Sequence, residues 1–290
     1  MKGLFLTAFI GLMFSANFAV AQKPQDETAP TWKNKLYSQM GYDEKLRFVA
    51  AKSDQVLTLF GRTEGDKINE EGRRMIKNHL DAYVRRAAKP KFDGCGSGDW
   101  LKSDLSSVLK RGAQYAAAIN EEFAAQKLPP ELGIYVAMIE TEFCPCLQSP
   151  TGSLGMFQWS TRTGELFGLK TRAGATPGNP DERCQPRPAS RAASKYFRSL
   201  IDLFGNDAVG VPVAVGAFNR GEGSTKMHIA AAAAVSDAAR ISFWVLIETQ
   251  DKVIEKLFKE SRETAAEEAD SFDEETETVL ETSRAPGFMK

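Results

Sequence analysis

The stretch LPPELGIYVAMIETEFCPC, residues 128–146, is strongly apolar, and a glutamate, Glu140, lies directly after its apolar run. Pro129 and Pro130 are typical of a helix start, and Glu131 suits the positive end of a helix. Apolar side chains then recur at helical spacing. A glutamate beside such a stripe is seldom fully buried without a partner. Glu140 is therefore either an ordinary solvated group or a carboxyl group held half out of water for a purpose.

Helical patterns also lie on both sides of this stretch. Between them, residues 147–188 are rich in Gly, Pro, Ser and Thr and predict loops with short helices. Ser190 is the expected N-cap of the helix at 189–204, and Gly205 its expected end. No stretch is rich in strand-forming residues, so the predicted fold class is mainly α. The other helical regions are expected at residues 32–89, 101–126, 208–220, 227–240 and 241–261.

The first 21 residues have the pattern of a secretory signal peptide. Lys2 is followed by an apolar run too short to span a bilayer, and Ala19–Ala21 form a small-x-small cleavage signal. The mature chain is expected to begin at Gln22 and to be exported, either periplasmic or secreted. No later segment has the roughly 20 apolar residues that a transmembrane helix needs.

Charge is distributed unevenly along the chain. Residues 263–290 contain nine acidic and two basic residues, which predicts a disordered acidic tail. The rest of the chain carries a net charge of +6. A mildly basic body suits an anionic target such as a cell-wall polymer, although ordinary surface charge explains it equally well. No nucleic-acid partner is expected, and the protein is expected to act as a monomer.

The four cysteines, Cys95, Cys144, Cys146 and Cys184, favour disulfides in an exported chain. A metal site is the competing interpretation, but Cys-Pro-Cys lacks the usual ligand gap. A bond between Cys144 and Cys146 would be strained. We therefore expect Cys95 to pair with one of them and Cys184 with the other.

Six short motifs, in order, resemble the catalytic segment of lytic transglycosylases of the goose-type lysozyme superfamily, most of all the membrane-bound lytic transglycosylase D type. The order and spacing agree over about residues 113–258. The motifs are ETEF (140–143), SPTGSLGMFQ (149–158), TGELFGL (163–169), DERCQP (181–186), SRAASKYFRSL (190–200) and GAFNRGEG (216–223).

This resemblance implies a lysozyme-like catalytic domain at residues 113–262, preceded by an N-terminal helical region at 22–112. It also implies cleavage of the β-1,4 bond between N-acetylmuramic acid and N-acetylglucosamine in peptidoglycan, without a metal or cofactor. Glu140 takes the place of the family's single catalytic acid. Thr141, Ser149, Gly152, Gly155, Gln158, Phe218, Asn219 and Glu222 take positions expected to bind substrate.

The chemistry explains why an acid would sit in an apolar helix. A glycosidic oxygen needs a proton, and burial raises the pKa of a carboxyl group so that it keeps one at neutral pH. In the resembling family, the same glutamate then takes a proton from the muramyl 6-hydroxyl, which gives a 1,6-anhydro sugar. Most glycosidases instead use two carboxylates. Candidates for a second carboxylate here are Glu142, Asp181, Glu182 and Glu222, each ranked first as a surface or structural group.

The chain departs from the family pattern at four positions. Thr141 replaces a serine, Phe218 replaces a tyrosine and Arg220 replaces a small residue. Lys252 stands where the last helix often has a tyrosine. These departures leave open a hydrolytic muramidase, an enzyme that prefers N-deacetylated peptidoglycan by means of Glu222 or Glu142, and an inactive glycan-binding protein.

Overall fold

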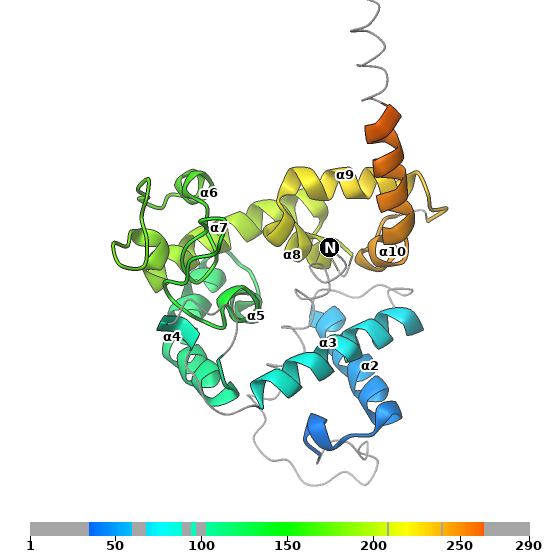
Figure 1. Ribbon diagram of the computed structural model, residues 1–290, viewed down its shortest axis with the longest axis horizontal. Helices are drawn as coiled ribbons and strands as arrows, with labels where there is room; N and C mark the ends of the chain where they lie inside the picture. Colours follow the sequence, from blue (N-terminus) through cyan, green and yellow to red (C-terminus); the bar gives the residue numbers. More distant parts are fainter. Residues whose placement is uncertain are drawn as a thin grey trace, which may run out of the picture. The chain divides into compact units, whose positions relative to one another are not determined.

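A computed structural model describes residues 35–59, 68–88, 94–96, 103–207, 209–238 and 240–263 (Figure 1). Within these ranges the chain is helical with no named strand, which confirms the mainly α prediction. The predicted signal peptide at 1–21 and almost all of the predicted acidic tail, 264–290, lie outside the described residues. None of the described helices is long and apolar enough to cross a membrane. The elements are η2 (Tyr37–Gln39), α2 (Tyr42–Leu59), α3 (Glu70–Ala87), η3 (Gly94–Gly96), α4 (Leu105–Ala125), α5 (Pro130–Thr141), α6 (Thr161–Leu166), η4 (Glu182–Cys184), α7 (Pro186–Phe204), α8 (Gly210–Arg220), α9 (Glu222–Ala233) and α10 (Phe243–Glu248).

The chain divides into two compact units. The larger one comprises the described residues up to Thr225 together with Ser242–Trp244. The smaller one comprises Lys226–Ile241 and the residues from Val245 onward. In the smaller unit, residues 250–263 are helical and carry ion pairs one turn apart, such as Lys256 with Glu260.

Helix α5 packs mainly against α4 and also contacts α7. Its buried residues include Leu132, Tyr135, Val136 and Ala137, so apolar side chains surround it on several sides. At Gly133 the contact with α4 is so close that an added Cβ would lie 2.6 Å from carbons of Ile119 and Phe123. A helix buried in this way is fixed by packing rather than by its intrinsic propensity.

Most helix boundaries follow local sequence signals. The helix predicted at 227–240 is displaced, because α9 begins at Glu222 and ends at Ala233. Pro130 opens α5 as predicted, and Gly205 ends α7 with a φ of 114°. The predicted cap of α7 at Ser190 is wrong, because the helix begins at Pro186 and Ser190 lies inside it. The Ser190 hydroxyl donates to the Pro186 carbonyl at 2.7 Å. Proline at the first helical position moved the start one turn earlier than the serine indicated.

Between α5 and α7 the chain forms a compact loop region with short helices, as its composition predicted. Isolated bridges join Gln148 to Leu154 and Leu154 to Trp159. Helix α6 begins at a genuine cap, because the Ser160 hydroxyl accepts the Thr163 amide at 3.0 Å. This region carries half of the predicted substrate-binding residues, namely Ser149, Gly152, Gly155 and Gln158.

Helices α2 and α3 pack on one another in the N-terminal region. Asp81 of α3 binds two lysines, Lys45 of α2 at 2.7 Å and Lys77 of its own helix at 2.9 Å. Asn69 caps α3 by accepting the Gly72 amide. The long helical region predicted over 32–89 is therefore two helices on either side of residues 60–67, which lie outside the described residues.

Candidate active site

Glu140 lies in the last turn of α5, one residue before the helix ends. The residue is half-buried, and loss of hydration raises the pKa of its carboxyl group to about 7. Apolar neighbours penalise the charged form because they cannot solvate it. At neutral pH about half of these groups therefore hold a proton, the condition that a general acid requires.

Asn219, at the end of α8, is the partner of this carboxyl group. Its side-chain amide donates to Glu140 Oε1 at 3.1 Å and opposes the rise in the pKa of Glu140. Helix α8 stops at Gly221, whose φ of 88° is accessible to glycine at little cost. The turn at Gly221 thus ends the helix just past Asn219, which is exposed at the helix end.

Aromatic rings cluster beside the Glu140–Asn219 pair. Phe218 stacks on Phe197 with ring centroids 4.5 Å apart, and Tyr196 and Trp159 lie at 5.3 and 5.8 Å from the same ring. Phe218 and Tyr196 are half-buried, so each is both core and surface. The negative charge of Glu222, together with burial, raises the pKa of Tyr196, so the two residues are near one another.

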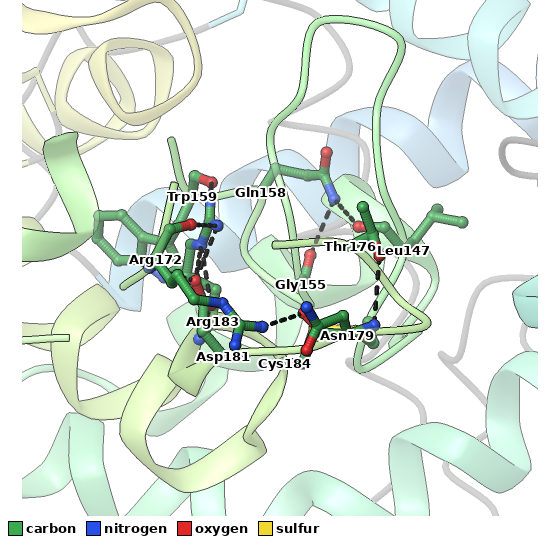
Figure 2. The surroundings of a disulfide bond; sticks show 11 residues. Leu147, Gly155, Gln158, Trp159, Arg172, Thr176, Asn179, Asp181, Arg183 and Cys184 are labelled. Carbon is green, nitrogen blue, oxygen red and sulfur yellow. Dashed lines mark hydrogen bonds and ion pairs between the residues drawn. A yellow bond between two sulfur atoms is a disulfide. The ribbon is translucent and has the colours of Figure 1, made fainter. Parts of the chain in front are cut away.

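The loop predicted to line the glycan cleft is held mainly by its own backbone. Ser149 Oγ accepts the Ser153 amide at 2.9 Å. The Gln158 amide donates to the carbonyls of Leu147 and Gly155 at 3.0 and 2.8 Å, as Figure 2 shows. Gly152 is exposed and Gly155 is buried, and both have a φ of 89°. Ser149 and Gln158 remain predicted substrate contacts whose present partners lie within the loop.

Thr141 lies in the interior rather than at the surface. It is 1% exposed, and its hydroxyl donates to the Met156 carbonyl at 3.0 Å. The hydroxyl that replaces the family's serine therefore ties the end of α5 to the loop. A direct contact with substrate would require this side chain to leave the core.

Arg183 supports the same loop from the side of η4. It is 2% exposed and pairs with Asp181 at 2.8 Å. Its Nη1 also donates to the Trp159 carbonyl at 3.4 Å (Figure 2). The same nitrogen donates to the Thr161 hydroxyl at 3.2 Å. The backbone of Gly155 lies directly against the Arg183 carbonyl, so that a Cβ there would collide with it.

The cysteines form two disulfides, Cys95–Cys144 and Cys146–Cys184. Each member of the Cys-Pro-Cys pair thus has a distant partner. The first bond joins the N-terminal region to the end of α5, and the second joins the same point to η4. Among the described residues no cluster of His, Cys, Asp and Glu side chains has the composition of a metal site.

The four candidate second carboxylates differ in their surroundings. Asp181 pairs with Arg183, and Glu182 accepts the Lys170 amide at 2.8 Å. Glu142 is 1% exposed and forms an ion pair with Arg86, so it cannot attract a cationic sugar as one interpretation of the sequence required. Glu222 is exposed in the first turn of α9 and is the remaining candidate.

Some residues that shape the site were not singled out from the sequence. Arg183 stands inside the quoted DERCQP motif, and a basic residue flanked by prolines and acids in a loop is a usable signal for a buried ion pair. Arg86 and Arg111 gave no such signal, because each stands in an ordinary amphipathic helix. Of the family departures, Arg220 is half-buried next to Asn219. Lys252 is exposed and belongs to the smaller unit.

Part of the chain is similar to known proteins. Residues 117–241 match the model of the transglycosylase SLT domain. A stretch of 88 residues is 36% identical to the peptidoglycan transglycosylase gp16 of Escherichia phage T7, and covers 30% of this chain but only 6% of the phage protein. No solved structure matches the chain significantly. The matched domain contains Glu140, the loop and Asn219.

Proposed function

We propose that this chain is an exported enzyme that cleaves the β-1,4 bond between N-acetylmuramic acid and N-acetylglucosamine in peptidoglycan. Glu140 acts as its single acid and base, and the product carries a 1,6-anhydro end. The observation that supports this most is the Glu140 carboxyl group, whose pKa is about 7 and whose oxygen binds Asn219. The match to the transglycosylase SLT domain supplies the substrate class.

In the first step, protonated Glu140 donates its proton to the glycosidic oxygen. The bond between that oxygen and C1 of the muramyl sugar breaks, and positive charge develops on C1. The Asn219 amide donates to one carboxyl oxygen, which leaves the other oxygen to carry the proton. The hydrogen bond also holds the carboxyl group in one orientation while the proton moves.

In the second step, the Glu140 carboxylate accepts the proton of the muramyl 6-hydroxyl. The oxygen of that hydroxyl bonds to C1 and closes the anhydro ring, so Glu140 is again protonated and no water is consumed. The amide of Asn219 stabilises the transient carboxylate between the two steps. One residue thus serves both half-reactions, as the resembling family leads one to expect.

The fate of the other acids supports this route over hydrolysis. A hydrolytic enzyme commonly uses a second carboxylate to activate water. Glu142, Asp181 and Glu182 are engaged by Arg86, Arg183 and the Lys170 amide, respectively. Only Glu222, of the four acids considered, is exposed near the aromatic cluster.

Digestion of purified sacculi tests the proposal. Glu140→Gln keeps the shape of the side chain but cannot transfer the proton, so release of muropeptides should fall by about 100-fold or more. Glu131→Gln is the matched control, because Glu131 is an exposed glutamate in the first turn of the same helix. It should retain full activity.

Mass spectrometry of the released fragments decides between the two products. Anhydro ends support the transglycosylase route, whereas fragments heavier by one water, about 18 Da, would show hydrolysis. Full activity in Glu140→Gln would refute the assignment of the acid.

Amino-terminal sequencing of the exported protein tests the proposed signal peptide. The sequence should begin at Gln22, and an intact Met1 in the exported fraction would contradict the proposed signal peptide.

A further inference from the structure

The end of α5 has an uncommon backbone. Glu142 and Phe143 are successive non-glycine residues in the left-handed region, with φ values of 53° and 63°. Such residues are uncommon, and a bulky one is a genuine outlier. Their amides donate back to the carbonyls of Met138 and Ala137, at 2.9 and 3.1 Å. This hook, residues 142–143, therefore closes the helical turn that contains Glu140.

An ion pair with a buried carboxylate and a partly exposed guanidinium lies under the hook. The Glu142 side chain is 1% exposed and pairs with Arg86 of α3, while Arg111 Nε donates to the Glu142 carbonyl at 3.0 Å. The Arg86 guanidinium also lies 4.6 Å from the centre of the Tyr83 ring. Burial raises the pKa of Glu142, and Arg86 and Arg111 oppose that rise. The charged and titratable groups around Glu142 are thus Tyr83 and Arg86 from α3 and Arg111 from α4.

The same two arginines meet at Ser103. Arg86 Nη1 donates to the Ser103 carbonyl at 2.9 Å, and Arg111 Nη2 donates to its hydroxyl at 2.8 Å. That hydroxyl also accepts the Gly94 amide at 3.0 Å. The neighbouring Cys95 is bonded to Cys144, which directly follows the hook. These contacts join the hook to three separate segments that precede α5.

We propose that Arg86 and Glu142 are a positioning pair that holds the last turn of α5, and with it Glu140, in place for catalysis. This inference rests on the proposed function of Glu140. If Glu142 lost its partner, its carboxylate would move toward water and open the hook. The two hydrogen bonds that close the last turn would then weaken, and Glu140 would lose its desolvated position.

An ion pair is a costly way to obtain stability alone. Replacing a buried pair by apolar residues of similar volume is often neutral or stabilising, so the pair is better explained by the orientation that it enforces. Arg86, Cys95, Ser103 and Arg111 all precede residue 117, where the matched domain begins. The N-terminal helices therefore belong to the catalytic unit rather than forming a separate module.

Kinetics of three variants on soluble glycan strands test the pair. Arg86→Met leaves the Glu142 carboxylate unpaired, so kcat should fall by about tenfold or more while KM changes less than about twofold. Its upper pH limit of activity should lie below that of the wild type, because hydration of Glu140 would reverse the rise that burial causes in the pKa of its carboxyl group. Adding Glu142→Gln to Arg86→Met removes the unpaired charge. The kcat of this double variant should therefore be at least about threefold higher than that of Arg86→Met alone. Arg74→Met is the matched control, because Arg74 pairs with Glu71 on the exposed face of the same helix.

A folded Arg86→Met protein with wild-type kcat and pH limit would overturn the inference, as would a double variant that recovers nothing. If Arg86→Met does not fold, Arg86→Lys replaces it. Lysine keeps the charge but cannot reach both Glu142 and Ser103 as a planar fork does, so kcat should fall by about threefold. A wild-type kcat there would also overturn the inference. Glu140→Gln separates the proposed function from the positioning role of Arg86 and Glu142. Full activity of Glu140→Gln would refute the acid–base role of Glu140, whereas the Arg86 variants test the positioning role alone.

Discussion

Glu140 owes its chemistry to residues that are far away in the sequence. Asn219 is 79 positions later, and the loop and aromatic cluster beside it come from between them. The apolar stripe of α5 alone indicates a half-dry carboxyl group, but its partner at Asn219 was found only through the resemblance of the GAFNRGEG motif to a family. The chain itself gives no local signal for a contact of that kind.

The elevated pKa of Glu140 predicts a pH-dependent change in stability. Below pH 4.5, its ordinary value, the group is protonated in folded and unfolded chains alike. As pH rises toward 7 the unfolded chain loses the proton first, and the folded chain is destabilised by up to about 3 kcal/mol. Glu140→Gln removes this loss, so the variant should be more stable than the wild type at pH 8 and nearly equal to it at pH 4. Urea unfolding of the variant and the wild type at pH 4 and pH 8 checks this. If the two proteins differ in their free energy of unfolding by the same amount at both pH values, the raised pKa of Glu140 is contradicted.

Two neighbours of Glu140 show where reasoning from single residues stops. Thr141 was expected to contact substrate, yet its hydroxyl is bound to Met156 inside the protein. Glu142 was ranked as a surface or structural group, and it is structural: α5 ends at Thr141, and the left-handed turn buries Glu142 against Arg86. The end of a helix decides the direction of these side chains, and no glycine marked that end.

At the scale of elements, periodicity predicted most helices because each buries one apolar face. Their ends were less predictable where two signals compete, as Pro186 and Ser190 do at the start of α7. The loop between α5 and α7 is fixed by contacts that no local pattern encodes. Arg183 and the Cys146–Cys184 bond hold its first part from η4, near its C-terminal end.

Two glycines of this loop allow a matched test of how closely it packs. Gly152 and Gly155 share a φ of 89°, but an added Cβ meets nothing at Gly152 and collides with the Arg183 carbonyl at Gly155. Gly152→Ala should therefore cost only backbone strain, about 1 kcal/mol. Gly155→Ala adds displacement of buried backbone and should cost roughly 3 kcal/mol or more. Urea unfolding measures both, and equal losses would show that the loop yields at Gly155.

For the whole molecule, the sequence predicted an N-terminal helical region and a catalytic domain as separate parts. The structure connects them through the contacts around Glu142 and through Cys95–Cys144. This connection was only partly predictable. The Cys-Pro-Cys pattern required distant partners, whereas Arg86 and Arg111 resemble any basic residue on a solvated helix. The disulfides are thus the part of this long-range organisation that the sequence announces most directly.

The two disulfides predict similar losses of stability when either is removed. They span 49 and 38 residues, and the entropy that a cross-link takes from the unfolded chain depends only weakly on such lengths. The paired replacements Cys95→Ala with Cys144→Ala, and Cys146→Ala with Cys184→Ala, should each lower the free energy of unfolding by about 2–4 kcal/mol. Urea unfolding of both variants measures these free energies. The wild type in reductant, in which both disulfides are broken, is the reference. A wild type that is indifferent to reductant, or a peptide map with four free thiols, would contradict the covalent connection. The kcat of the two variants gives a further result. If kcat falls in Cys95→Ala with Cys144→Ala but not in Cys146→Ala with Cys184→Ala, the N-terminal region acts on Glu140 through the Cys95–Cys144 bond as well as through the ion pair of Arg86 and Glu142.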